Sequence, residues 1–320
     1  MYLIVTFFSL LFLFKSILLN YFYNNFLMLM LFPLELSGVS MYSYNSTTSE
    51  INTYIRWSLI GWLGFENEKE IISNIQEFEN NEYAMIVCWL IVFSLFQLYY
   101  IVKERLIKKQ SINKWSYFSY NLKYAMINYL SLYLWNLNVL VNMKNNNFWF
   151  VLINLLIFNC IAFWFPGLLF NFIYGDKLYI YRVKYAFLIN NFVLRYKSFS
   201  IILLGFKALI GLYFIFFYLF YLGSKYYLLG ILIAFSILVF YKSLFVNRNI
   251  KYYLLKINLI SMLTISLSIV EDYYPNIIEL VLTKLVLIIF QIILIIYYYY
   301  KDYKCRINDN FNENDPIIIN

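Results

Sequence analysis

Long apolar blocks with almost no charge constrain this chain more than any other feature. The clearest block covers residues 280–300 and contains one charged residue, Lys284. A helix that crosses the hydrocarbon core of a bilayer needs about 20 consecutive, mainly apolar residues. Over all 320 residues, 63% are apolar and 13% are charged, and the mean hydropathy is +0.66. Because a soluble domain of this size could not cover so much apolar surface, the sequence predicts an all-α, polytopic transmembrane helical bundle.

The number of apolar blocks sets the expected number of spans. The blocks that we expect to be helical cover residues 3–19, 26–44, 49–64, 84–102, 117–141, 148–173, 185–194, 199–222, 226–245, 252–270 and 280–300. Counting every block predicts about eleven spans, whereas counting only the longest predicts roughly eight, which agrees better with the positive-inside rule. We expect one transmembrane domain at residues 1–300, with an acidic solvent-exposed loop at residues 65–83, and a polar C-terminal tail at residues 301–320.

The composition excludes several kinds of cofactor site. The chain has no histidine, which excludes haem with histidine ligands, imidazole-bound copper and carboxylate-bridged histidine metal sites. The three cysteines, Cys88, Cys160 and Cys305, lie far apart and form no CxxC motif. We therefore expect no metal ion and no cofactor, and we interpret the cysteines as small apolar side chains and one thiol in the tail.

The positive charge is better explained by a membrane than by nucleic acid. The net charge is +8, but the lysines and arginines gather in short loops, most densely at residues 103–109. Basic residues in short loops orient a membrane protein according to the positive-inside rule. We therefore expect a lipid bilayer and no nucleic acid as a partner. The 34 tyrosines, the 32 phenylalanines and the missing histidine are typical of AT-rich codons, which suggests an organelle genome.

Among the charged side chains inside apolar blocks, we single out Glu35, Lys123, Lys207 and Lys242 as candidates for a site. An ionisable group at the centre of a bilayer costs about 2.5 kcal/mol or more, so it should face protein or water, or pair with an opposite charge. A lysine near a helix end can instead extend its ammonium group to the interface, which applies best to Lys242 and less well to Lys123. Lys207 and Glu35 are deeper in their blocks. Opposite buried charges on different helices favour proton or ion movement, and static contacts between helices are the alternative.

Several short motifs follow one another in a familiar order. Leu34-Glu-Leu-Ser-Gly-Val-Ser-Met-Tyr42 is similar to a Leu-Glu-Leu-x-Ser-x-x-x-Tyr motif, with the serine shifted. Residues 49–57 begin with Ser-Glu, and residues 117–123 approach a lysine as a Phe-Leu-Ser-x-x-x-Lys motif does. Phe-Tyr-Lys at residues 240–242 and Tyr-Tyr-Tyr-Tyr-Lys at residues 297–301 follow near the C-terminus. In this order the chain resembles NADH dehydrogenase subunit 2, an antiporter-like membrane subunit of respiratory complex I.

The resemblance implies roles for particular residues. Glu35 would be the acidic half of a Glu-Lys pair, Lys123 the central lysine, and Lys242 the distal lysine of a proton channel, with Lys256 as the alternative for the distal position. The family places the basic half of the pair where this sequence has Gln97, so either Lys103 or Lys207 takes its place, or the pair is absent. Eleven spans would correspond to the family's fourteen without the first three.

The resemblance also implies an activity and a location. The chain would be a non-redox, proton-translocating subunit of NADH:ubiquinone oxidoreductase in the mitochondrial inner membrane, and quinone reduction elsewhere in the complex would drive the proton steps. Its partners would be the other membrane subunits of that complex. Two alternatives stay open: an organelle-encoded accessory subunit of cytochrome oxidase or ATP synthase, and a free-standing secondary transporter. A transporter would be expected to carry an inverted repeat, and none is apparent in the sequence.

Overall fold

The described part of the chain consists of α-helices and one π-helical turn, and it contains no β-strand. The computed structural model describes residues 25–41, 94–95, 97–102, 105, 121, 125–126, 128–130, 132–134, 136–137, 148–174, 199–220, 225–241, 248–274 and 277–312. Its labelled elements are α2 (Asn25–Val39), α7 (Phe148–Asn159), η3 (Cys160–Trp164), α8 (Phe165–Tyr174), α11 (Phe199–Phe220), α12 (Lys225–Tyr241), α13 (Arg248–Tyr273) and α14 (Ile278–Asn312). The prediction of an all-α chain is thus confirmed for these residues.

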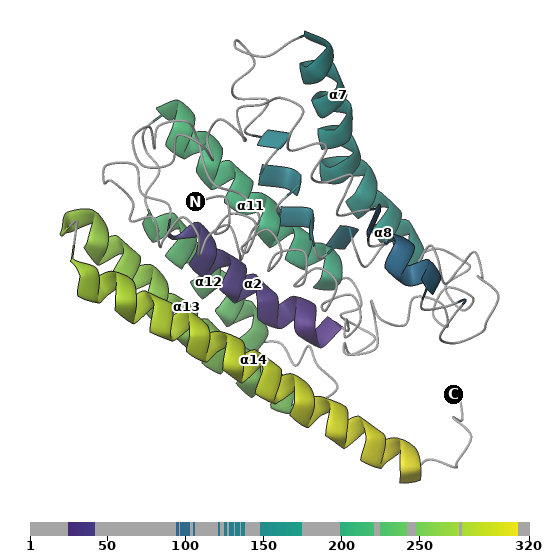
Figure 1. Cartoon of the computed structure of the whole chain (residues 1–320). Coiled ribbons are helices and arrows are strands. Elements are labelled where there is room, and N and C mark those ends of the chain that lie inside the picture. Colours follow the sequence, from purple (N-terminus) through teal and green to yellow (C-terminus); the bar gives the residue numbers. More distant parts are fainter. Residues whose placement is uncertain are drawn as a thin grey trace.

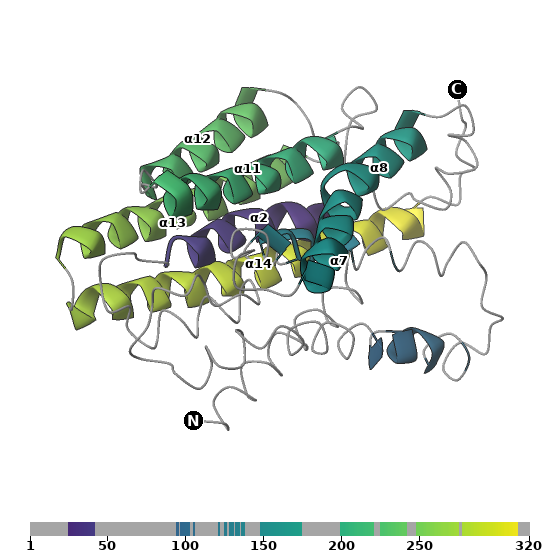
Figure 2. The ribbon, with the colours of Figure 1, turned by 90° about the horizontal axis from the view of Figure 1, so that it is seen from above.

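Helix α2 is the centre of the bundle. It lies between the pair α13 and α14 on one side and the pair α11 and α12 on the other (Figures 1 and 2). The side chains of residues 29–41 are all buried. A helix that is apolar on every side is stable either inside a protein or surrounded by lipid, and the burial of α2 corresponds to the first case. Any charge on α2 therefore faces protein.

Helices α7, η3 and α8 form one continuous helical stretch beside this bundle (Figure 1). The sequence predicts a disturbance here at Pro166, because proline has no backbone N–H and cannot bond to the carbonyl four residues earlier. The disturbance takes the form of the π-helical turn η3. The N–H of Phe165 bonds to the carbonyl of Cys160, five residues back, which widens the helix just before the proline.

Helix α14 shows how polar and apolar side chains are distributed across the bundle. Lys284 and Gln291 are fully buried, whereas Val286 and Ile293 are 63% and 56% exposed. This arrangement inverts that of a soluble helix, whose polar side faces outward. It matches a helix whose outer face contacts lipid and whose inner face contacts other helices.

Three helices in the described part are long and apolar enough to cross a membrane: Val151–Asn171, Asn249–Tyr273 and Ile278–Lys301. Their length and composition indicate a membrane protein. Shorter apolar helices cover Leu29–Val39, Phe199–Tyr213 and Lys225–Tyr241. The expected count of about eleven spans, or of eight, is not supported by these residues, because three of the described helices meet the length and hydropathy of a span and many of the apolar blocks lie partly or wholly outside the described residues.

The predicted acidic loop at residues 65–83 also lies outside the described residues. The first part of the predicted tail is helical, because α14 continues beyond Lys301 to Asn312. A helix of this length extends roughly 50 Å, which exceeds the thickness of the hydrocarbon core. The polar end of α14 therefore continues as helix past the apolar segment.

Candidate functional site

Glu35 and Lys207 form an ion pair in the interior of the bundle. Oε2 of Glu35 lies 2.8 Å from Nζ of Lys207, and the two side chains are 6% and 1% exposed. No donor among the described residues reaches this oxygen at the angle of a hydrogen bond, so the contact is an ion pair without an aligned hydrogen bond. The two residues come from α2 and α11, which are far apart in the sequence.

Lys207 lies far from both ends of α11, whereas Glu35 lies about 6 Å before Val39, the last residue of α2, at 1.5 Å per residue. Lys207 is about 12 Å from the start of α11 at 1.5 Å per residue, which is too far for a lysine side chain to reach the interface. The stem of Glu35 is shorter still, and every described side chain around it on α2 is buried. The only way to keep both groups charged at this depth is to place them against each other.

Aromatic side chains close one side of the pair. Phe32 lies one turn before Glu35 and Phe206 directly before Lys207, and their ring centroids are 6.1 Å apart. Phe235 of α12 contacts both rings, at 4.8 Å from Phe32 and 5.5 Å from Phe206. This aromatic group excludes water from that side, which strengthens the electrostatic interaction and raises the free-energy cost of separating the pair.

The structure thus selects one of the partners that the sequence left open for Glu35. Of the two lysines that the sequence offers in place of Gln97, Lys207 forms the ion pair with Glu35. Gln97, where the resemblance would lead one to expect a lysine, donates a hydrogen bond to Asn121. Lys103, Lys123 and Lys242 lie outside the described residues, so their predicted roles stay predictions.

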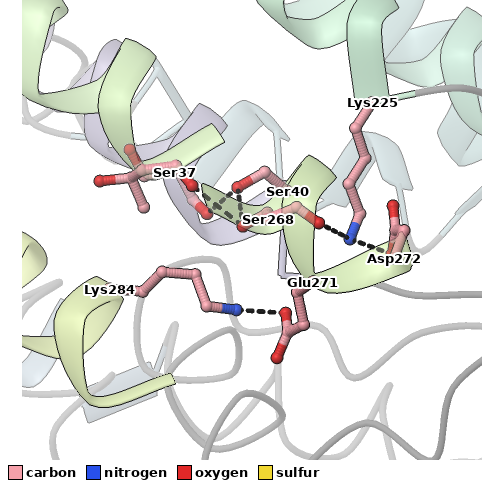
Figure 3. Close-up of polar contacts among 8 residues, drawn as sticks. Ser37, Ser40, Lys225, Ser268, Glu271, Asp272 and Lys284 are labelled. Carbon is pink, nitrogen blue, oxygen red and sulfur yellow. Dashed lines mark hydrogen bonds and ion pairs between the residues drawn. The ribbon is translucent and has the colours of Figure 1, made fainter. Parts of the chain in front are cut away.

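A second group of charges, which the sequence reading missed, lies where α12 begins, α13 ends and α14 begins (Figure 3). Lys225 contacts Asp272 at 2.7 Å and donates a hydrogen bond to the carbonyl of Ser268 at 3.0 Å. Lys284 forms an ion pair with Glu271. We call these four residues, Lys225, Glu271, Asp272 and Lys284, the charge cluster. Lys225, Glu271 and Lys284 are buried, and the Asp272 side chain is 34% exposed.

Helix α13 also buries a row of polar side chains that sequence reading could have found. Its members are Asn258, Ser261, Thr264, Ser268 and Glu271. They recur at intervals of three or four residues in an otherwise apolar block, which places them on one side of a helix. This periodicity was a usable signal. In contrast, Lys225 precedes an apolar block and has the position of an ordinary loop lysine.

The described residues contain no group of three or more cysteine, aspartate or glutamate side chains that could hold a metal ion. What the Glu35–Lys207 site can do chemically is exchange a proton, because an acid and a base meet there in a low-dielectric interior.

No protein-family model matches this chain, and comparison with curated proteins and with solved structures found no match.

Proposed function

We propose that this chain is a proton-translocating membrane protein and that the Glu35–Lys207 pair is a site at which protons are exchanged. The observation that supports the proposal is the burial of a carboxylate and an ammonium group, 2.8 Å apart, deep in two apolar helices. Ionisable groups within membrane helices are costly, and they commonly mark ion or proton pathways. A purely structural contact could use apolar side chains at lower free-energy cost.

The elementary step is the transfer of one proton within the pair. An N–H bond of the Lys207 ammonium breaks and an O–H bond forms on Glu35, which leaves a neutral amine and a neutral carboxylic acid. The local charge is conserved, so the step needs no counter-ion. If the acid then releases its proton to one neighbour and the amine takes a proton from another, one proton has moved past the pair.

We further propose that the chain is a divergent relative of NADH dehydrogenase subunit 2 and acts within NADH:ubiquinone oxidoreductase of the mitochondrial inner membrane. The resemblance of the motifs around Glu35 and the order of the later motifs support this assignment. In this role the chain carries no redox centre, its partners are the other membrane subunits, and Lys123 and Lys242 are further proton-exchanging residues. Quinone reduction elsewhere in the complex shifts the balance between the charged and the neutral pair.

The test compares Glu35→Gln and Lys207→Met with Lys304→Met in membrane vesicles that contain the assembled chain. Lys304 is an exposed lysine near the end of α14 and serves as the matched control. NADH-driven acidification, NADH oxidation and migration of the complex on native gels are measured together. We expect both variants of the pair to lower the number of protons moved per NADH oxidised, while the control keeps it.

Two outcomes would contradict the proposal. An unchanged proton yield in both pair variants would leave the pair a static contact between helices. Migration of the chain with cytochrome oxidase or ATP synthase subunits would remove the assignment to NADH:ubiquinone oxidoreductase.

A further inference from the structure

The polar side of α13 makes a continuous series of contacts with three neighbouring helices. Ser261 donates a hydrogen bond to the carbonyl of Pro33 on α2 at 2.9 Å. Ser268 and Ser40 have their hydroxyl oxygens 3.3 Å apart. The carbonyl of Ser268 accepts the hydrogen bond from Lys225, so the row ends on the charge cluster (Figure 3). The row from Asn258 to Glu271 is about 20 Å long at 1.5 Å per residue.

Two amide oxygens at the inner end of this row lack a donor. The Gln291 amide N–H donates to Ser261 at 2.6 Å, and the Asn258 amide N–H donates to Ser236 of α12 at 2.8 Å. Both side chains are at least 99% buried, and neither Oε1 of Gln291 nor Oδ1 of Asn258 accepts a hydrogen bond from the described residues. A buried acceptor without a donor costs about 1–3 kcal/mol, and an internal water molecule removes that cost.

The row stops abruptly toward the beginning of α13. Leu254, one turn before Asn258, and Ile257, directly before it, are apolar and fully buried. At the other end, the row meets the charge cluster, where Asp272 is partly exposed. The polar side is therefore closed by apolar packing at one end and reaches a partly exposed charge at the other.

Helix α2 separates this row from the Glu35–Lys207 pair. Pro33 and Ser37 lie within about 40° of each other around α2, at 100° per residue. Pro33 and Ser40, which directly follows the helix, contact α13. Glu35 lies about 160° from Ser37 on the same helix and faces Lys207 of α11. The two polar regions thus lie on opposite sides of one helix.

We propose that the polar side of α13 is a hydrated inlet, which holds a file of water molecules from the charge cluster to Asn258 and Gln291. The ligand is water, held first by the two amide oxygens without donors. The hydroxyl groups of Ser261, Thr264 and Ser268 already donate to backbone carbonyls, so they take part only as acceptors. The occupancy of the inlet follows from α13 and its neighbours alone. Its role, which is to bring protons from the partly exposed cluster to the interior of the bundle, rests on the proposed function.

A proton can pass between Lys284 and Glu271 in the charge cluster in the same way as between Lys207 and Glu35. An N–H bond of the Lys284 ammonium breaks, an O–H bond forms on Glu271, and a neutral amine and a neutral acid result. The acid can release its proton to the first water of the inlet, and the amine can take a proton from the exposed side. One proton then enters the inlet and the cluster regains both charges.

The test measures hydration directly by radiolytic hydroxyl-radical labelling, in which radicals form from water at the site. In full-length chain with the native cysteines changed to serine, in lipid nanodiscs, Ser261→Cys is compared with two controls. Leu254→Cys is a buried, dry position on the same helix, and Leu259→Cys lies on its exposed, apolar side. We expect thiol oxidation of Ser261→Cys to be about tenfold faster than that of either control, because only its side of the helix holds water.

Equal rates of thiol oxidation at positions 261, 254 and 259 would contradict the proposal that this side of α13 holds water. If Ser261→Cys does not fold, Thr264→Cys is used, since Thr264 lies one turn further along the same row. The result is also separate from the proposed function. Fast oxidation of Ser261→Cys together with normal proton yield in Glu35→Gln would keep the inlet and reject the pair as a proton-exchange site. A normal yield in Glu271→Gln with fast oxidation would keep the water and reject the role of the cluster.

Discussion

The Glu35–Lys207 pair is best examined with a double-mutant cycle, in which Glu35→Gln and Lys207→Met are made singly and together. At 2.8 Å and an effective dielectric constant of about 20, the attraction between the two unit charges is about 6 kcal/mol. Removing both charges from water costs several kcal/mol for each, so the intact pair contributes little net stability. The cycle separates these two opposing terms.

The three variants should differ sharply. Each single substitution leaves one buried charge without its partner, and we expect it to lower the free energy of unfolding by about 3 kcal/mol. The double variant has neither charge and should be within about 1 kcal/mol of the wild type. Two losses of 3 kcal/mol against a nearly neutral double variant give a coupling of about 6 kcal/mol, which matches the attraction expected at this distance.

The free energy of unfolding is measured in lipid–detergent mixed micelles by titration with sodium dodecyl sulfate, with circular dichroism at the helix band as the signal. Lys256→Met, an exposed lysine on α13, is the control and should change stability by no more than about 0.5 kcal/mol. Additive losses, in which the double variant is about 6 kcal/mol less stable than the wild type, would refute the argument. The two side chains would then act independently and would not form a pair.

The remaining predictions use the same unfolding measurement. Gly211→Ala should lower the free energy of unfolding by about 1–3 kcal/mol, because the added Cβ would lie 2.0 Å from the Tyr133 ring. The control, Gly205→Ala on the same helix, meets no atom within 4 Å and should be neutral or slightly stabilising. Equal effects of the two substitutions would contradict this packing. Ser261→Ala should lower the free energy of unfolding by about 1–3 kcal/mol, because it leaves the carbonyl of Pro33 on α2 and the amide of Gln291 on α14 without their partner. Ser266→Ala, at an exposed position of α13, should change stability by less than about 0.5 kcal/mol, and a loss as large as that of Ser261→Ala would refute the role of the buried row.

The positions of the later helices could be predicted well from the sequence. The apolar blocks at residues 199–222, 226–245, 252–270 and 280–300 coincide closely with α11, α12, α13 and α14. Hydropathy over a window of about 20 residues is a local property, and a helix satisfies its backbone hydrogen bonds within its own segment. Neither depends on what the rest of the chain does. The same reasoning identified Glu35 and Lys207 as deep charges.

The number of spans could not be predicted in the same way. Residues 26–44 and 226–245 are apolar enough to suggest spans, and the described parts of α2 and α12 there contain 15 and 17 residues. Helix α2 is surrounded by protein from residue 29 onward, although its apolar composition would suit lipid equally well. Apolarity alone does not distinguish contact with lipid from contact with other helices.

The sequence by itself determined that this chain is helical, that it suits a membrane, and that a carboxylate and a lysine lie at depth. Only the tertiary structure decided which charges meet. Glu35 pairs with Lys207 because α2 and α11 pack with these positions facing each other, and Lys225 turns inward because α13 presents Asp272 at that place. Pairing depends on the relative rotation and height of two helices, which are set by the packing of their whole surfaces and leave no trace in either segment alone.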